Sequence, residues 1–553
     1  MLKQKYLISA VFSIAILSAD DGANRPRGIA SITVCNSDPT GAFTQSCGAA
    51  YDTERMVLAP GFPPESINQA GFGTATDEHS TVFPPGHLGG NGDYMFFVAT
   101  GFLGVNPDIG LMVLSSHGAD DHGQWTIQPA TDQAYGNYAA GPGQVFLSPM
   151  KPTVCPDVPG QNTTDPQVQQ QDQTFDLNYA VPGSVFQDPT SGRLLMVYEG
   201  NNDCVGAPGG PKPGGDSYQT IGVATSLDAG RTWPQYASNG LYTPAGLPLA
   251  NPVSPTTRYG PQEPIGAMGP AVCMGNTCAP NVPATYGRYE VLSPSINLNT
   301  FMQGMVLPNS FGHSEPSAFV DDVQPGNRGD DNPPPYVYIV THYLSDDLSP
   351  LLPSSNGRKD DLSVARAKLD PSGAPLQFSK WNGASFPVVS NGLTGTDSSM
   401  LSNASDGNFR ACGDNASTQG RSAGSISFVE DTGQYLLLFV CSSPGDPAHG
   451  APTPNAFGSA WFYSTTDNLD DQSSWSIPTE IEGSYADHTP YKPGCMVYNG
   501  WYPTMMSLNK APGHLSTEGY VFYLTGSLST CNGDGLAPRT YSSRQFTIVT
   551  APR

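Results

Sequence analysis

The stretch Ile221–Trp233 reads IGVATSLDAGRTW and joins a strand to a tight turn and an aromatic side chain. Apolar residues alternate with small or polar ones over its first half, which is typical of a strand with one buried face. Asp228 can accept hydrogen bonds from the backbone amides of its own turn, and Gly230 can adopt a positive φ. Trp233 can fold back onto the neighbouring strand as an apolar anchor. The stretch predicts a turn with a role in folding. Its value as evidence for a fold depends on whether similar stretches recur along the chain.

The same order of elements recurs along the chain. Each unit has a short first strand, a polar turn, an apolar second strand and a third strand, and several units end near a tryptophan. The first strands are expected at residues 77–83, 181–186, 314–320, 422–429 and 501–507. Their alignment places a hydroxyl residue at one equivalent position in every unit, namely at Ser80, Ser184, Ser317, Ser425 and Thr504. The recurrence predicts five similar sheets, and the alternative is an irregular sandwich whose strands merely look alike.

The composition favours an all-β protein with long loops. Gly 62 and Pro 53 make up about a fifth of the 553 residues, which indicates many turns. Lys+Arg 24 against Asp+Glu 48 gives a formal net charge of −24. This acidic balance argues against nucleic acid and against a membrane surface as partners. We expect a monomer.

The first 19 residues predict secretion. A short basic region precedes an apolar run that is too short for a comfortable membrane span, as in a secretory signal peptide. An uncleaved N-terminal anchor is the alternative. The ten cysteines then predict disulfides. Cys35 and Cys47, like Cys273 and Cys278, are close enough in sequence to form local pairs, and the remaining pairings stay open.

The pattern Ser226-x-Asp228-x-Gly230-x-Thr232-Trp233 resembles the Asp-box of sialidases and related β-propellers. Together with the five-fold recurrence, the resemblance implies a five-bladed β-propeller with long inter-strand and inter-blade loops. Residues 76–553 would form the propeller, 20–75 an N-terminal arm lying against it, and 1–19 the signal peptide. Each unit exceeds the roughly 40–50 residues that a four-stranded blade needs, so the units carry inserts. The polar spacer 391–420 is expected to be exposed.

In a propeller, the first strand of each blade lines the central channel, and the residues just before it surround one mouth. Here those positions carry carboxylates, histidines, an arginine and aromatic residues, namely Asp77, Glu78, His79, His313, Glu315, Arg421, Trp501 and Tyr502. A glycosidase needs this mixture. One carboxylic acid protonates the leaving oxygen, a second carboxylate activates water or attacks, and an aromatic ring stacks on a sugar face.

Glu315, in HSEPSAFVDD, resembles the general-acid Glu of arabinanase- and xylosidase-type five-bladed glycoside hydrolases. Asp77 or Glu78 stands where those enzymes place the base Asp. Those enzymes carry an Asp-Pro motif in blade two, whereas this chain reads AVPG at 180–183, and Asp176 could substitute. The resemblance implies Glu315, Asp77, Glu78 and Asp176 as catalytic candidates. The substrate-binding candidates are His79, His313, Arg421, Trp501 and Tyr502, and the resemblance implies a carbohydrate as the partner. No cofactor is expected, apart from a possible structural calcium in a channel lined by oxygens.

Other functions remain open at this point. A carbohydrate-binding propeller without catalysis would need only aromatic and amide groups at the mouth. A sialidase-like exo-glycosidase would need an arginine triad, which the sequence does not make evident. A lyase on acidic polysaccharide would need more Lys and Arg than the chain has. Each candidate also has a structural reading, in which Glu315 caps a loop, Arg421 forms an ion pair and the aromatic residues pack the channel.

Overall fold

The computed structural model describes most of the predicted strands and the turns between them. The described residues are 27–34, 55–58, 75–88, 94–102, 106–116, 126–127, 144–146, 179–202, 218–226, 229–230, 233, 288–293, 311–323, 335–344, 360–371, 376–393, 395, 397–401, 420–444, 457–481, 497–507, 510–527 and 539–552. Within these ranges the chain is almost entirely strand, and the one helical element is the short 3₁₀ helix η7 (Gln472–Ser474). The prediction of an all-β fold is confirmed. No helix within the same ranges has the length and hydropathy to cross a membrane.

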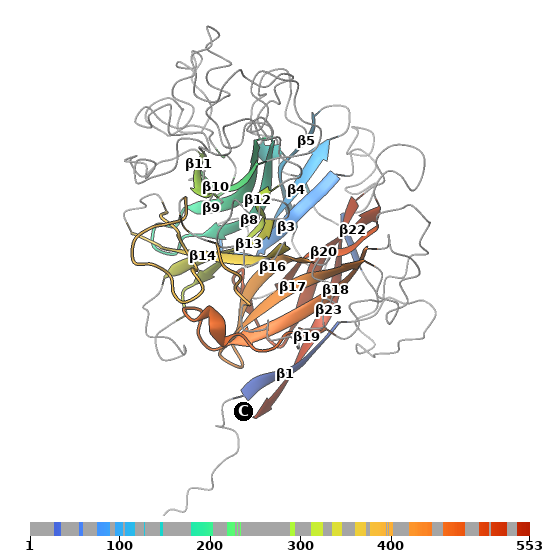
Figure 1. Cartoon of the computed structure of the whole chain (residues 1–553). Coiled ribbons are helices and arrows are strands. Elements are labelled where there is room, and N and C mark those ends of the chain that lie inside the picture. Colours follow the sequence, from blue (N-terminus) through green and yellow to red (C-terminus); the bar gives the residue numbers. More distant parts are fainter. Residues whose placement is uncertain are drawn as a thin grey trace, which may run out of the picture.

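The strands form five successive antiparallel units (Figure 1). In pairing order, unit one is β3 (Ala75–Phe83), β4 (Tyr94–Phe102), β5 (Asn106–Ser116) and β6 (Thr126–Ile127); unit two is β8 (Tyr179–Gln187), β9 (Leu194–Asn202), β10 (Tyr218–Ser226) and β11 (Arg288–Leu292); unit three is β12 (Phe311–Asp321), β13 (Tyr336–Leu344), β14 (Asp360–Lys368) and β15 (Ser379–Lys380). Unit four is β16 (Gly420–Val429), β17 (Gln434–Pro444), β18 (Phe457–Thr466) and β19 (Thr479–Glu480); unit five is β20 (Val497–Met506), β22 (Glu518–Ser527), β23 (Arg539–Pro552) and β1 (Arg27–Val34). Three short strands add to these units: β7 (Gln144–Phe146) pairs with β5, β2 (Arg55–Leu58) with β23 and β21 (His514–Leu515) with β16.

The first strand of each unit, here called an inner strand, contacts the inner strands of both neighbouring units. The contacts run from β3 to β8, β12, β16 and β20, and from β20 back to β3. Side-chain hydroxyls join neighbouring inner strands: Thr81 Oγ1 accepts a bond from Val185 N at 3.0 Å, and Ser425 Oγ donates to Pro503 O at 2.9 Å. The inner strands therefore form a closed cycle. A brief parallel pairing of β10 with β12 also merges units two and three into one eight-stranded sheet.

Apolar layers lie between successive units. One cluster joins units one and two, a second joins two and three, a third joins three and four, and the largest joins four, five and one. Strand β17 explains why an unbroken apolar run is needed. Leu436 and Leu438 face the layer shared with unit five, whereas Leu437 and Phe439 face the layer shared with unit three. Because successive side chains of a strand point to opposite faces, a sheet covered on both sides needs apolar residues at consecutive positions.

The outer strand of unit five comes from the start of the chain. Strand β1 pairs antiparallel with β23 from Arg27 opposite Pro552 to Val34 opposite Phe546. Ile32 is buried with Val34 in the apolar layer of this unit. Residues 20–75 were expected as an arm lying against the main body, and β1 within that stretch is part of the sheet itself. The pairing ties the two ends of the described chain together (Figure 1).

The turn after β10 has several of the features expected of it. Gly230 has φ 84°, and its N–H donates to Ser226 Oγ at 2.9 Å. Trp233 is 2% exposed and donates from Nε1 to Gly230 O at 3.0 Å. In unit four, Trp475 closes a similar turn by donating to Gln472 Oε1 at 2.8 Å. The Asp-box itself stays a prediction, because its aspartate, Asp228, lies outside the described residues. The signal peptide, Asp176 and the cysteine side chains also lie outside them, so the predictions for these groups stay predictions as well.

Candidate active site at the bulges of the inner strands

Each inner strand breaks register with its neighbour at an equivalent place. The shifts fall between Asp77 and Thr81, Pro182 and Val185, Ser314 and Ser317, Ser422 and Ser425, and Trp501 and Thr504. In four of the five bulges one non-glycine residue is left-handed: Glu78 (φ 63°), Glu315 (φ 54°), Ala423 (φ 49°) and Tyr502 (φ 51°). The fifth strand has a proline at the equivalent position, whose ring fixes a negative φ. Such conformations cost about 1–3 kcal/mol each and cluster at functional sites.

The predicted mouth residues lie within the inner strands rather than before them. Strand β12 begins at Phe311 and β3 at Ala75, so Glu315 and Glu78 are bulge residues. For Asp77 the structure gives only the backbone, which pairs with Ala99. A bulge re-aims side chains that a regular strand would point alternately to its two faces. The irregularity explains how residues adjacent in sequence reach one site.

Glu315 is the centre of this site. Its side chain lies 8% exposed, and donors from two other units bind it. Oε2 accepts a hydrogen bond from Ala423 N at 2.7 Å, and Oε1 accepts one from Trp501 Nε1 at 3.2 Å. His342 Nδ1 of β13 lies 3.5 Å from Oε2. Burial raises the pKa of Glu315, but His342 and the two hydrogen bonds outweigh burial, so the pKa lies below its usual value and the carboxyl is ionised at neutral pH.

A second carboxylate holds the backbone of Glu315. Glu315 N donates to Glu199 Oε2 at 3.1 Å, and Gln219 Nε2 donates to Glu199 Oε1 at 3.2 Å. Glu199 comes from β9 and is 5% exposed. A carboxylate of unit two therefore binds the bulge of unit three, just as the carboxylate of Glu315 binds the bulge of unit four through Ala423.

His79 and Tyr502 join this site through Trp501, whose ring meets the Tyr502 ring edge-on at 6.2 Å. The His79 ring is fully buried, with Nδ1 3.1 Å from Thr504 Oγ1, and it meets the Tyr502 ring edge-on at 5.6 Å. Burial lowers the pKa of His79 to about 4, although the charge of Glu315 opposes this. The imidazole is therefore neutral at neutral pH. Glu78, the left-handed residue before it, is 3% exposed.

His313 anchors the start of β12 through a buried charge cluster. Its Nε2 lies 3.0 Å from Asp397 Oδ1, its Nδ1 lies 2.9 Å from Thr341 Oγ1, and Lys380 Nζ lies 3.1 Å from Asp397. Burial lowers the pKa of His313 more than Asp397 raises it. Burial raises the pKa of Asp397, but Lys380 and His313 lower it further, so the carboxylate is ionised. His313 is therefore bound within the fold, two residues from Glu315.

The cluster corrects one expectation about the 391–420 spacer. Asp397, Met400 and Leu401 are 5%, 0% and 2% exposed, so the prediction of an exposed spacer is wrong for this part. Arg421 forms an ion pair with Asp361 of β14, with Nε 3.3 Å from Oδ1 and both side chains about nine-tenths buried. The structural reading considered for Arg421 thus describes its observed contact.

Of the candidate residues predicted from the sequence, the structure brings together Glu315, Trp501, Tyr502 and His79. It adds Glu199 and His342, which the sequence reasoning did not include. A signal for both was present: each is a polar residue inside an apolar second strand, in RLLMVYEG and PYVYIVTHY. Buried polar residues are informative because burial of an unsatisfied polar group is costly.

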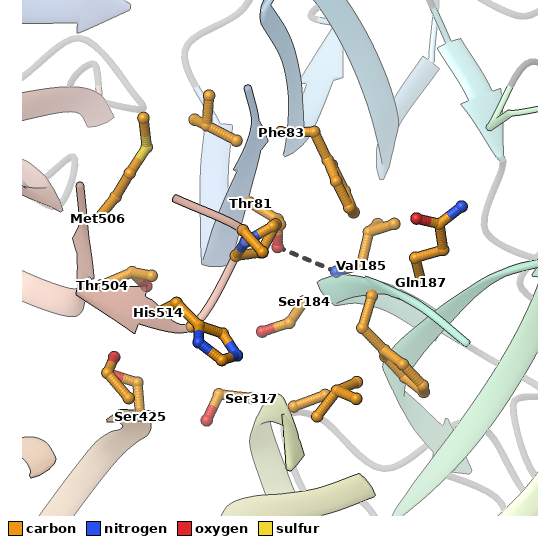
Figure 2. A pocket seen from close by; sticks show the side chains of 18 of the residues that line it. Thr81, Phe83, Ser184, Val185, Gln187, Ser317, Ser425, Thr504, Met506 and His514 are labelled. Carbon is orange, nitrogen blue, oxygen red and sulfur yellow. Dashed lines mark hydrogen bonds between the residues drawn. The ribbon is translucent and has the colours of Figure 1, made fainter. Parts of the chain in front are cut away.

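Beyond the bulges, the inner strands enclose a cavity of about 150 Å³ (Figure 2). The five hydroxyl residues that the sequence placed at one equivalent position all line it, namely Ser80, Ser184, Ser317, Ser425 and Thr504. His514 also lines the cavity, with Nε2 3.0 Å from Asp322 Oδ1. The cavity shows that the inner strands of all five units surround one space. Within the described part of the chain no group of three or more His, Cys, Asp or Glu side chains could hold a metal ion, and the structural calcium remains an expectation.

Comparisons with known proteins give similarity to solved structures only. No family model and no curated protein matches the sequence. An α-L-arabinofuranosidase from Podospora anserina matches with a TM-score of 0.35 and 10% identity over 86% of this chain and 92% of that one. An α-L-arabinanase from Penicillium chrysogenum matches with 0.35 and 10% over 89% and 98%, and an α-L-arabinofuranosidase from Fusarium graminearum with 0.37 and 9% over 89% and 97%. At these values the matches assign neither a site nor a substrate to this chain.

Proposed function

We propose that this protein is a secreted glycoside hydrolase that acts on a polysaccharide or glycoconjugate, and that its five units are the blades of a five-bladed β-propeller. The closed cycle of inner strands and the apolar layers between units support the propeller. One observation carries the enzymatic part. The ionised, buried carboxylate of Glu315 lies at a left-handed bulge, where Trp501 and Tyr502 supply aromatic surface from another unit.

In glycoside hydrolysis one ionised carboxylate attacks the anomeric carbon or takes a proton from water, while a second carboxyl group protonates the leaving oxygen. The lowered pKa of Glu315 favours the first role over the acid role that its resemblance implies. We assign the acid role to Glu78, the buried carboxyl of the unit-one bulge, with Asp77 as its alternative. Trp501 and Tyr502 offer ring faces or edges to the sugar.

A carbohydrate-binding propeller without catalysis is the second candidate. It is favoured by the fact that both oxygens of Glu315 already accept hydrogen bonds from the protein, through Ala423 and Trp501. On this reading the carboxylate caps the bulge of unit four, and the aromatic residues alone hold the sugar. A sialidase-like activity has less support, because the contact seen for Arg421 is with Asp361.

The test is a panel of plant, bacterial and fungal glycans, with product release measured for the wild type and for Glu315→Gln. Loss of a positioned catalytic carboxylate should slow hydrolysis by about 10²–10⁴-fold while circular dichroism stays unchanged. Glu518→Gln at the start of β22 changes an exposed carboxylate away from the bulges, so it is the matched control and should retain activity. Binding of a glycan without release of any product would favour the non-catalytic candidate.

A glycoside with an activated aryl leaving group separates the two roles of Glu315. Such a leaving group departs without protonation, so loss of a general acid leaves its hydrolysis largely intact. We expect Glu315→Gln to lose activity on this substrate as well. Retained activity would return Glu315 to the acid role.

Secretion through residues 1–19, disulfides among the ten cysteines and a monomeric state are further parts of the proposal. N-terminal sequencing and the mass of the exported protein before and after reduction test them.

A further inference from the structure

The backbone of Glu315 is held in a conformation that L-residues rarely adopt. Its φ is 54°, and it lies where β12 loses register with β13, between Ser314 and Ser317. At a bulge the extra residue is left out of the strand ladder, so its N–H needs a partner elsewhere. A left-handed residue other than glycine persists only where its surroundings fix it.

Glu199 supplies that partner. It lies on the second strand of unit two, 116 residues away in sequence, and its Oε2 accepts the Glu315 N–H at 3.1 Å. Gln219 of the neighbouring β10 donates to the other oxygen at 3.2 Å, which fixes the direction of the carboxylate. Gln219 is held in turn, since its backbone pairs with Gly312 where β10 runs parallel to β12. A continuous set of contacts therefore leads from β10 to the bulge.

The bulge of unit four shows the same arrangement one step further on. Ala423 is also left-handed, and its N–H donates to Glu315 Oε2 at 2.7 Å. Units three and four thus each have a left-handed bulge whose N–H is bound by a carboxylate from the preceding unit. Glu199 is the first member of this series, and rotation of the Glu315 backbone would displace the carboxylate that binds Ala423.

We propose that Glu199 is a positioning residue that holds the Glu315 backbone left-handed and thereby aims the Glu315 carboxylate at Trp501 and Ala423. The consequence for catalysis rests on the proposed function. The consequence for the Glu315 carboxyl group does not, and it can be measured without a substrate.

Three variants test the inference. Glu199→Met keeps the length of the side chain and removes both acceptors. Glu199→Gln keeps one acceptor for the Glu315 N–H and is the conservative variant expected to rescue function. Glu518→Met, on the second strand of unit five, removes an exposed carboxylate away from the bulges and serves as the matched control. Should Glu199→Met fail to fold, Gln219→Met takes its place, since it leaves Glu199 without the donor that orients it.

The first readout is a pH titration of the Glu315 carboxyl group, monitored through the fluorescence of Trp501. Subtracting the signal of each protein's Trp501→Phe counterpart isolates this residue from the other tryptophans, and the titration is read where circular dichroism shows an intact fold. In the wild type the midpoint should lie below 4.5, the ordinary value for a glutamate. Glu199→Met should move the midpoint upward, because the carboxylate loses its alignment with its donors. Glu199→Gln and Glu518→Met should leave it unchanged.

The second readout is steady-state kinetics on the glycan found by the panel. Glu199→Met should lower kcat by about 10- to 100-fold, with KM changed less than about threefold, and Glu199→Gln should recover most of the loss. A wild-type midpoint and wild-type kcat in Glu199→Met, or in Gln219→Met where that variant replaces it, would overturn the inference. A shifted midpoint in a protein that cleaves no glycan would uphold the role of Glu199 and reject the proposed hydrolase activity.

Discussion

The two halves of the inner strands differ in a way that locates the candidate site. The first halves contain the bulges, with left-handed Glu78, Glu315, Ala423 and Tyr502, and we call this the bulge end. The second halves are regular strands that line the cavity with one hydroxyl residue per unit, and we call this the hydroxyl end. The same five strands thus carry irregular backbone at one end and regular pairing at the other.

The contacts at each end match this difference. At the hydroxyl end, side chains join strand to strand, as Ser425 does by donating to Pro503 O at 2.9 Å. The ion pair between Lys510 and Glu430 lies there too, with about a third of each side chain exposed. Charged groups are buried at both ends: Glu315 and Asp397 at the bulge end, and Asp188 and Asp321 at the hydroxyl end. The left-handed backbone is therefore what distinguishes the bulge end. A strained backbone costs free energy, and such strain clusters at functional sites, so we infer that the bulge end carries the function and the hydroxyl end holds the ring together.

The largest effect is expected from breaking the buried charge cluster behind the bulge end. Lys380→Met leaves the Asp397 carboxylate buried without its cation and should lower the free energy of unfolding by about 3–5 kcal/mol. The matched change at the hydroxyl end, Lys510→Met, removes an exposed ion pair and should cost about 0–1 kcal/mol. Urea denaturation of both variants measures the two costs. Equal costs would contradict the contrast between the two ends.

Two glycines give the next contrast. Gly312 has φ 115°, and an added Cβ would overlap the carbonyl oxygen of Gln219. Gly312→Ala should therefore cost about 2–4 kcal/mol, from crowding together with a disfavoured φ. Gly192, in the turn after β8, has φ 75° with open space around its Cβ position, so Gly192→Ala should cost only about 1 kcal/mol. Thermal unfolding checks the order, and a larger loss at Gly192 would reject this account of the β10–β12 junction.

Smaller, pH-dependent effects are expected at two histidines, one at each end, and the first is His514 at the hydroxyl end. Burial lowers its pKa, but Asp322 and Glu430 raise it further, so the folded pKa lies above 6.5. Its contribution to stability is therefore fully present below pH 6.5 and is lost as the pH rises through the folded pKa. His87 and Lys510 are the other titratable groups nearby. His514→Gln should lower the free energy of unfolding more at pH 6 than at pH 9, as denaturation at the two pH values would show.

His79, at the bulge end, should give a pH dependence of stability of the opposite sign. The pKa of His79 is lowered to about 4 in the fold, so the stability from its neutral, buried ring is present above pH 6.5. That stability is lost as the pH falls toward 4. Replacing His79 by Gln should therefore reduce the loss of stability between pH 6.5 and 4, and an unchanged pH dependence would contradict its burial as a neutral ring.

Much of the strand order could be predicted because each strand has a recognisable pattern within its own few residues. The apolar run of β17 and the aligned hydroxyls of Ser80, Ser184 and Ser317 need only the two-residue period of a strand. The pairing of β1 with β23 could not be predicted in the same way, because nothing near Arg27 specifies a partner more than 500 residues away.

The candidate site was predictable in its members but not in its connections. Glu315 and Trp501 were expected near one mouth, and the hydrogen bond between them joins β12 to β20. The left-handed bulges were missed because glutamate, alanine and tyrosine do not favour a positive φ. Glu199 was missed because its partner is a backbone N–H of another unit. Asp397 was missed because it lies in a polar stretch, and the sequence does not show that this stretch packs its carboxylate against Lys380 and His313 inside the fold.

The most direct test of a single site at the bulge end is an experimental structure of Glu315→Gln with a bound oligosaccharide that the wild type hydrolyses. Our account predicts a sugar ring in contact with Trp501 or Tyr502, with residue 315 beside the bond that is cleaved and a carboxyl group of Glu78 or Asp77 across from it. A sugar bound beside His514 at the hydroxyl end, or on the outer strands, would contradict it.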